Sequence, residues 1–373
     1  MADLAAMTEM AKARTARIQR AVAGLAESEG GAPGLLISDP ANRQYATGFT
    51  GSAGYGLFTT DRAILLTDFR YVEQAKRQAP GCEIRRHGTP ATATLREVAA
   101  ELGLTRLAFE AEQVSVAERG RLADALPDLE LVPTERLIEK LRMVKDDAEL
   151  RLIEAAVECA DEAFARLLAS GVVVPGRTER EVAAKLEYEM KMLGAARPSF
   201  DTIVASGPRS SLPHGRASDR VMARGDFVTI DFGAEVDGYC SDITRTLVLG
   251  GPTAKQREIY DLVLKAQLAG VAAIRPGISG READAAARDL IVAAGHGEHF
   301  GHGLGHGIGL AVHESPRLAP TSDAVLAAGM VSSVEPGIYI PGWGGVRIED
   351  LVVVTDDGCR VLTKTTKQLI EVQ

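Results

Sequence analysis

Cysteine is scarce in this 373-residue chain, and the four that are present show no paired spacing. They are Cys82, Cys159, Cys240 and Cys359. A disulfide framework is therefore not indicated, and we interpret the four as reduced structural thiols. The sequence also lacks an apolar run near the roughly 20 residues that span a bilayer, and an apolar signal-like segment at its N-terminus. These absences predict a cytoplasmic protein with no membrane partner.

An excess of basic residues is missing as well. The chain has 42 Lys and Arg against 51 Asp and Glu, which gives a formal net charge of −9. Such a charge repels nucleic acids and anionic membranes, so we expect neither as a partner. The length and the 46% hydrophobic content are sufficient to bury large cores, and they predict two domains.

The first predicted domain covers residues 1–135. Short strand-like runs, such as residues 34–38, alternate there with helical patterns, which indicates an α/β domain. We find no cluster of ligand-type residues in it, and we assign its only histidine, His87, to the surface. A linker is predicted over residues 136–145, and the second domain occupies residues 146–373.

Sequence motifs in the second predicted domain indicate where its helices begin. Thr178-Glu-Arg-Glu181 and Ser279-Gly-Arg-Glu282 are capping boxes, in which the first side chain and the last satisfy each other's backbone N–H groups. Helices and strands fall in separate runs along this part of the chain. That order indicates an α+β fold in which helices back one curved antiparallel sheet.

Residues 226–249 predict a β-hairpin in which Asp237-Gly238 is a two-residue loop. The register set by this loop makes Asp231 and Asp242 diagonal neighbours on one face, about 7–8 Å apart. Two bare carboxylates would repel each other there, and a dication between them would remove the repulsion. Taken alone, the pair fits equally well with two solvated carboxylates near a turn, which is how we interpret Asp237.

Glycine alternates with larger residues from Gly301 to Gly309. Each interior glycine costs a helix up to about 1 kcal/mol relative to alanine, so we expect an extended segment. The period of two then places His302 and His306 on one face, while the bare face lets another backbone approach closely. A low-complexity His/Gly loop is the competing interpretation. It explains neither the strict alternation nor the Val-His313-Glu sequence that follows.

Two further glutamates stand among strand-like apolar residues, in Glu335-Pro-Gly and in Arg347-Ile-Glu349. Buried carboxylates are costly unless they are paired or bound to a cation, so we predict a metal site. The candidate ligands are Asp231, Asp242, His306, Glu335 and Glu349. Five oxygen and nitrogen ligands are enough for two cations that share carboxylates. One imidazole and no thiolate suit Mn²⁺, Co²⁺ or Zn²⁺ better than a structural zinc.

These motifs resemble those of the aminopeptidase P and prolidase family, the pita-bread metallopeptidases related to methionine aminopeptidase and creatinase. The resemblance rests on Asp231, Ser-Asp242-Ile-Thr-Arg, His302-Gly-Leu-Gly-His306, Val-His313-Glu, Glu335-Pro-Gly, Arg347-Ile-Glu349, Ser-Leu-Pro-His214-Gly, Gly48-Phe-Thr-Gly-Ser52 and Leu66-Thr-Asp-Phe-Arg-Tyr71. It covers nearly the whole chain in the right order. It implies a pita-bread catalytic domain over residues 146–373, preceded by a creatinase-like α/β domain.

The resemblance also implies how the metal site is arranged. Asp242 and Glu349 would bridge two divalent metal ions, most simply Mn²⁺, and Asp231 would bind one of them. His306 and Glu335 would complete the other. Two such cations hold and activate a bridging water and polarise the scissile carbonyl. Glu335 would have a second role as the shuttle for the proton of that water.

Four further residues receive roles from the same resemblance. His214 and His302 would lie near the leaving residue of the substrate, and His313 near the oxyanion of the tetrahedral intermediate. Arg347 would orient a metal-bound carboxylate. For the three histidines, a satisfied polar contact beside the site is the competing interpretation.

The implied activity is that of an exopeptidase which cleaves between an N-terminal residue and a following proline. Peptides that begin with Xaa-Pro would be its substrates, and a homodimer or a dimer-based tetramer its assembly. The motifs at residues 48–52 and 66–71 look more like aminopeptidase P, and the alternative is a dipeptidase restricted to Xaa-Pro. A non-catalytic pita-bread binding protein would be expected to have lost ligands, whereas all five are present.

Overall fold

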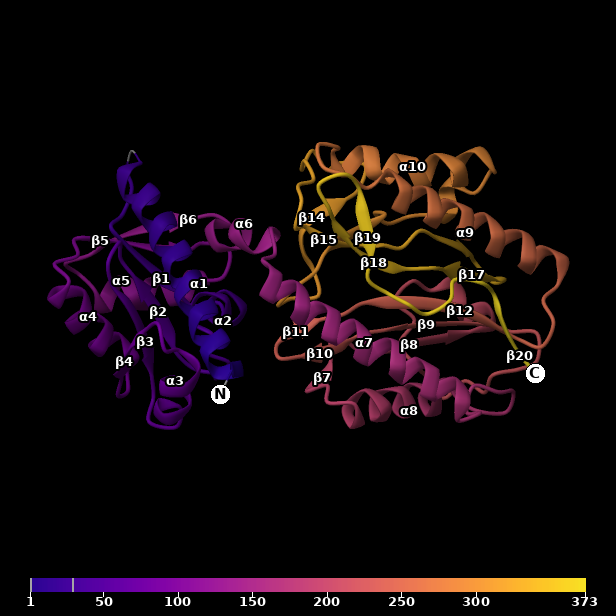
Figure 1. Cartoon of the computed structure of the whole chain (residues 1–373), viewed down its shortest axis with the longest axis horizontal. Coiled ribbons are helices and arrows are strands. Elements are labelled where there is room, and N and C mark those ends of the chain that lie inside the picture. The colour runs from indigo at the N-terminus through magenta and orange to yellow at the C-terminus, as the bar shows by residue number, and fades with distance from the viewer. Residues whose placement is uncertain (1, 29) are drawn as a thin grey trace. The chain divides into compact units, whose positions relative to one another are not determined.

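The computed structural model describes residues 2–28 and 30–373, which form two compact units. The first unit ends at Arg142 and the second begins at Met143. No helix in the described part of the chain is both long enough and apolar enough to cross a membrane. Figure 1 shows the elements of both units along the chain.

The first unit is built on one six-stranded sheet in the order β4-β3-β2-β1-β5-β6. Its strands are β1 (Gly34–Ile37), β2 (Tyr55–Phe58), β3 (Ala63–Thr67), β4 (Glu83–Arg86), β5 (Arg106–Glu110) and β6 (Glu130–Thr134). Its helices are α1 (Ala2–Glu27), α2 (Pro40–Thr47), α3 (Val72–Gln78), α4 (Ala91–Glu101), α5 (Val116–Ala125) and α6 (Leu137–Met143). Strand β1 pairs antiparallel with β2 and parallel with β5, so the sheet is mixed and the α/β character predicted from the sequence is confirmed.

Helix α6 lies within residues 136–145, the segment that the sequence analysis assigns to a linker. Arg142 of this helix is buried, and its Nη1 donates a hydrogen bond of 2.6 Å to Asn42 Oδ1. Ile138 of the same helix is buried as well. The last turn before the second unit is therefore packed structure.

The second unit contains four long helices, α7 (Asp147–Ala169), α8 (Glu179–Met192), α9 (Ala254–Ala273) and α10 (Gly280–Ala293). Two short 3-10 helices are also present: η1 (Gly207–Ser211) lies between α8 and α9 in the chain, and η2 (Gly297–His299) follows α10. Its strands are β7 (Arg197–Pro198), β8 (Ile203–Ser206), β9 (Phe227–Phe232), β10 (Ala234–Val236), β11 (Tyr239–Cys240), β12 (Ile243–Leu249), β13 (Gly305–Gly307), β14 (Glu314–Leu318), β15 (Val331–Val334), β16 (Gly337–Ile340), β17 (Gly344–Arg347), β18 (Asp350–Val354), β19 (Cys359–Val361) and β20 (Ile370–Val372).

Each pair of long helices covers its own group of strands (Figure 1). Helices α7 and α8 pack on the sheet β20-β12-β9-β8, where the rings of Phe164 and Phe232 stack at 5.3 Å. Helices α9 and α10 pack on strands β15 to β18 through residues such as Val263, Ala287 and Val352. The α+β prediction is confirmed, with the strands divided between two halves. The described strand pairs of this unit are antiparallel except for β12 and β20.

The capping boxes predicted from the sequence are present. Thr178 Oγ1 accepts a hydrogen bond from the backbone N–H of Glu181 at the start of α8, and the Glu181 carboxylate accepts one from Thr178 N. Ser279 and Glu282 do the same for α10. These exchanges satisfy N–H groups that the first helical turn leaves without partners.

The predicted hairpin also has the expected register. Asp237 and Gly238 form the tip with φ angles of 50° and 84°, as a two-residue loop of this kind requires. Below the tip, Asp231 pairs with Thr244 in the β9–β12 ladder. The chain therefore places Asp231 and Asp242 as diagonal neighbours, which is the arrangement that the loop predicted.

Candidate active site

The glycine run positions His306 by allowing two strands to approach it closely. A Cβ atom at Gly305 would lie 2.0 Å from the backbone oxygen of Ser333, and one at Gly307 would lie 2.2 Å from that of Ser315. The expected close approach of neighbouring backbone is confirmed. Only Gly305–Gly307 is strand (β13), and a bulge follows His306, so His302 lies in the preceding loop.

Side chains from both halves of the unit meet beside this strand. One ligand atom each from Asp242, His306 and Glu349 lie within 4.8 Å of one another. His306 Nε2 is 3.6 Å from Asp242 Oδ2 and 3.3 Å from Glu335 Oε1. Asp231 faces the same region from β9, and Arg347 Nη2 donates to its Oδ2 at 2.6 Å. The structure thus brings together the five residues predicted as ligands.

Electrostatics show why these carboxylates need a cation. Burial raises the pKa of Asp242 well above its usual value, and the negative charges of Glu349 and Asp231 add to the effect. Burial and the charge of Glu335 raise the pKa of Glu349 in the same way. Burial opposes the ionisation of Glu335 too, but its hydrogen bond to His306 and the charge of that ring lower its pKa to about 2. The cluster resists full ionisation without a positive charge among its members.

Two oxygens of the cluster have no protein partner. Within the part of the chain that the structure describes, Asp231 Oδ1 and Glu349 Oε1 are buried and accept no hydrogen bond. Buried acceptors of this kind cost free energy unless something satisfies them. His306 adds a nitrogen that can bind a metal ion. Its Nδ1 lies 3.1 Å from Gly307 O, which leaves Nε2 facing the carboxylates. These features fit a group of divalent cations.

Arg347 is buried and forms hydrogen bonds that support the carboxylate cluster. Its Nε donates to Thr244 Oγ1 at 3.0 Å and its Nη1 donates to the Tyr339 hydroxyl at 2.9 Å. Thr244 in turn donates to Glu349 Oε2 at 2.7 Å. With its bond to Asp231, the guanidinium fixes two of the carboxylates, one directly and one through Thr244.

Three polar residues of this network were missed by the sequence analysis. They are Thr244, Ser333 and Tyr339. Ser333 Oγ donates to Glu335 Oε1 at 3.0 Å and accepts from His306 N at 3.0 Å. The period of two along β12, which puts Thr244 on the same face as Asp242, was the one available signal.

The three other histidines that the sequence analysis placed near the site, His214, His302 and His313, differ in their environments. His302 lies 2.8 Å from the Tyr339 hydroxyl through Nε2, and burial lowers its pKa. His313 is exposed, and its ring lies 4.4 Å from that of His306. Burial of part of its ring and the neighbouring His306 lower the pKa of His313, and His214 contributes to the same shift. His214 is exposed on the loop that follows η1.

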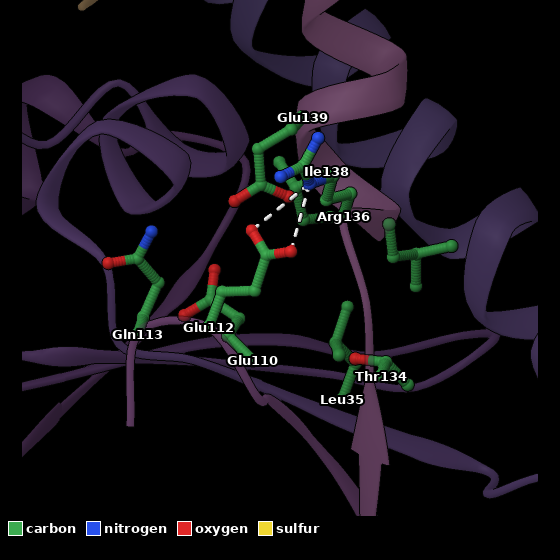
Figure 2. A pocket seen from close by; sticks show the side chains of 9 residues that line it. Leu35, Glu110, Glu112, Gln113, Thr134, Arg136, Ile138 and Glu139 are labelled. Atoms are coloured by element: carbon green, nitrogen blue, oxygen red, sulfur yellow. Dashed lines mark hydrogen bonds and ion pairs between the residues drawn. The ribbon is translucent and has the colours of Figure 1, made fainter. Parts of the chain in front are cut away.

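A second acidic group lines a small pocket of the first unit (Figure 2). Figure 2 shows Arg136 pointing at Glu112, and its Nε donates to the two carboxylate oxygens at 2.9 and 3.1 Å. Glu110 accepts hydrogen bonds from Ser38 N at 2.6 Å and Asn42 Nδ2 at 2.7 Å. Because protein donors satisfy these carboxylates, we assign no site to the pocket.

The family of the chain follows from a comparison of its second unit with known proteins. Residues 151–356 match the model of metallopeptidase family M24. The chain belongs to this family. Residues 17–144 match the creatinase/prolidase N-terminal domain, so this member of M24 carries both parts that its motifs implied. M24 is a family of divalent-metal peptidases, and the chain is accordingly a metallopeptidase with a pita-bread catalytic domain.

Individual M24 relatives resemble nearly the whole chain. An uncharacterized peptidase of Bacillus subtilis is 49% identical over 340 residues, or 91% of this chain and 96% of that one. The structure of an Xaa-Pro dipeptidase from Bacillus anthracis has a TM-score of 0.92 at 48% identity and covers 97% of this chain and 100% of its own. An X-Pro aminopeptidase structure from Thermotoga maritima has a TM-score of 0.87 at 40% identity, with coverages of 91% and 98%.

Proposed function

We propose that this protein is a metal-dependent exopeptidase that cleaves the bond between an N-terminal residue and a following proline, with Xaa-Pro dipeptides as its substrates. The carboxylate–imidazole cluster with its two unsatisfied oxygens carries the proposal. The Xaa-Pro activity is supported by the relatives, because the dipeptidase structure matches at 48% identity and the aminopeptidase structure at 40%.

An Xaa-Pro aminopeptidase acting on longer peptides is the second candidate. Its support is the motifs at residues 48–52 and 66–71, together with the resemblance to the Thermotoga maritima enzyme over 98% of that chain. The two candidates share one reaction and differ only in whether the product side of the cleft accepts a chain beyond proline. Both assign catalysis to residues 146–373 and a creatinase-like domain to residues 1–135, joined by the segment 136–145 that contains helix α6.

Five side chains would hold two divalent cations, for which we propose Mn²⁺, with Co²⁺ and Zn²⁺ as the alternatives. Asp242 and Glu349 would bridge the pair, Asp231 would bind one ion, and His306 and Glu335 would complete the other. Carboxylate-rich sets with one imidazole and no thiolate favour such ions. When bound, they would polarise the scissile carbonyl and activate the attacking water.

The chain's own residues would supply the proton transfer and the binding. Glu335, whose Oε1 lies 3.3 Å from His306 Nε2, would accept the proton of the attacking water and pass it to the leaving nitrogen. His313 would donate a hydrogen bond to the developing oxyanion. His214 and His302 would contact the leaving proline, and the His302–Tyr339 hydrogen bond of 2.8 Å would fix the second of these rings. Arg347 would keep Asp231 in place.

The substrate class can be tested with three peptides of related composition. An Ala-Pro dipeptide should be hydrolysed much faster than an Ala-Pro-Ala tripeptide, and an Ala-Ala dipeptide should be a poor substrate. Free alanine released from each peptide is the measurement. Faster cleavage of the tripeptide would replace the dipeptidase by the aminopeptidase. No cleavage of either proline peptide by metal-loaded protein would contradict both.

We also propose a cytoplasmic homodimer or dimer-based tetramer, on the resemblance to the family. One chain has a mass of 39.5 kDa, and light scattering of the active protein should give at least twice this mass. A fully active species with the mass of one chain would contradict this assembly.

A further inference from the structure

Glu179 is a buried carboxylate that the proposed chemistry does not use. It is the first residue of helix α8, and its side chain is 0% exposed. A charge in that position costs a fold several kcal/mol unless hydrogen bonds and an opposite charge surround it. The donors that surround Glu179 therefore show what the buried charge holds in place.

Those donors come from the two ends of one loop. Glu179 Oε1 accepts from the backbone N and the Oγ of Ser206, both at 2.8 Å. Glu179 Oε2 accepts from the backbone N of Ser218 at 3.1 Å and from its Oγ at 2.6 Å. The same oxygen accepts from Arg209 Nη1, which supplies the positive charge. One carboxylate thus closes the segment from residue 207 to residue 217, which we call the His214 loop.

Hydrogen bonds within the His214 loop, and one from the carboxylate cluster, also fix its backbone. Arg209 Nη2 donates to the backbone oxygen of Arg216 at 2.8 Å, and Arg216 N donates to His214 O at 2.9 Å. On the side of the carboxylate cluster, Arg347 Nη1 donates to Pro213 O at 3.1 Å. The imidazole of His214 is itself exposed, so its position depends on this backbone.

We propose that Glu179 is a positioning residue that fixes the His214 loop and thereby sets the imidazole of His214 against the proline of the substrate. This inference rests on the proposed function, which gives His214 a substrate contact. It goes beyond that function because it extends substrate recognition to a residue outside the metal cluster. We expect the effect of Glu179 to fall on KM, since its contacts are to Arg209 in this loop and to Ser206 and Ser218 at the two ends of the loop.

A Glu179→Gln variant tests the inference. The amide keeps the shape of the side chain, but its NH₂ group cannot accept from the donors that face one of the two oxygens. KM for Ala-Pro should rise about tenfold, the size of one lost hydrogen bond to a charged group, while metal content and kcat stay near their parent values. Glu181→Gln is the matched control, because Glu181 lies on the same helix with its carboxylate at the exposed cap. The KM of the Glu181→Gln variant for Ala-Pro should equal that of the parent.

A double-mutant cycle shows whether Glu179 acts through His214. In a His214→Ala background, Glu179→Gln should add little to KM, because two changes on one path are not additive. An equal rise of KM in both backgrounds would overturn the inference and leave the proposed function intact. A His214→Ala protein with the parent KM would remove the substrate contact of His214, and with it both claims about this loop.

Ser218→Ala provides the same cycle with a smaller disturbance if Glu179→Gln does not fold. It removes one donor at the far end of the loop and leaves the Glu179–Arg209 charge pair in place. KM should rise about threefold in the parent and remain unchanged in the His214→Ala background. A threefold rise in both backgrounds, or none in the parent, would overturn the inference.

Discussion

Asp242→Asn should abolish hydrolysis of Ala-Pro and leave the purified protein with at most one of its two metal ions. Asp242 is 5% exposed, and one of its carboxylate oxygens lies within 4.8 Å of a ligand atom of Glu349 and of one of His306. A neutral amide cannot offset the charge of a dication, and it is a poor bridge between two ions. Elemental analysis and an assay on the same preparation measure both effects.

Misfolding can be separated from loss of the ligand. Burial and the charges of Glu349 and Asp231 raise the pKa of Asp242, so removing its charge relieves repulsion in the metal-free protein. The metal-free variant should therefore melt no lower than the metal-free parent. Asp237→Asn is the matched control, because Asp237 is exposed at the tip of the same hairpin with a φ of 50°, which asparagine tolerates. A fully metallated Asp242→Asn protein would remove Asp242 from the ligand set.

His313→Ala should lower kcat by about 10² to 10³-fold, which corresponds to about 2.7–4 kcal/mol for one donor to an oxyanion. Both metal ions should remain, because the proposed ligand set does not include His313. The loss should fall on kcat more than on KM, since the imidazole interacts with the transition state more strongly than with bound substrate. Steady-state kinetics and metal analysis give the two readouts.

The histidine of the first unit offers a control for this variant. His87→Ala removes a half-buried imidazole from that unit and should leave kcat unchanged. If His313→Ala lost a metal ion, His313 would be a ligand and the role of His306 would need revision. If it kept its metals and a normal kcat, His313 would be a packed loop histidine without a part in the reaction.

Local signals explain most of what could be predicted from the sequence. The Asp237-Gly238 loop fixes the register that brings Asp231 and Asp242 together, because a two-residue turn leaves the ladder no freedom. The alternating glycines around His306 permit the close approach of β14 and β15. In both places the chemistry depends on spacing within a short segment.

Contacts between distant segments could not be predicted in this way. Thr244 and Glu349 are hydrogen-bonded although they lie 105 positions apart, and Tyr339 joins His302 to Arg347. The parallel pairing of β20 with β12, Ile370 opposite Leu247, was not expected either. Ordinary threonine, tyrosine and isoleucine residues carry no local pattern that names such a partner.

Metal content and Ala-Pro hydrolysis, followed together through chelation and restoration, test the central claim most directly. Activity should disappear as the metal leaves and return as two equivalents of Mn²⁺ or Co²⁺ are added back, because an oxygen-rich set of five ligands holds two ions of this kind. Undiminished hydrolysis by protein that elemental analysis shows to be free of metal would contradict the account.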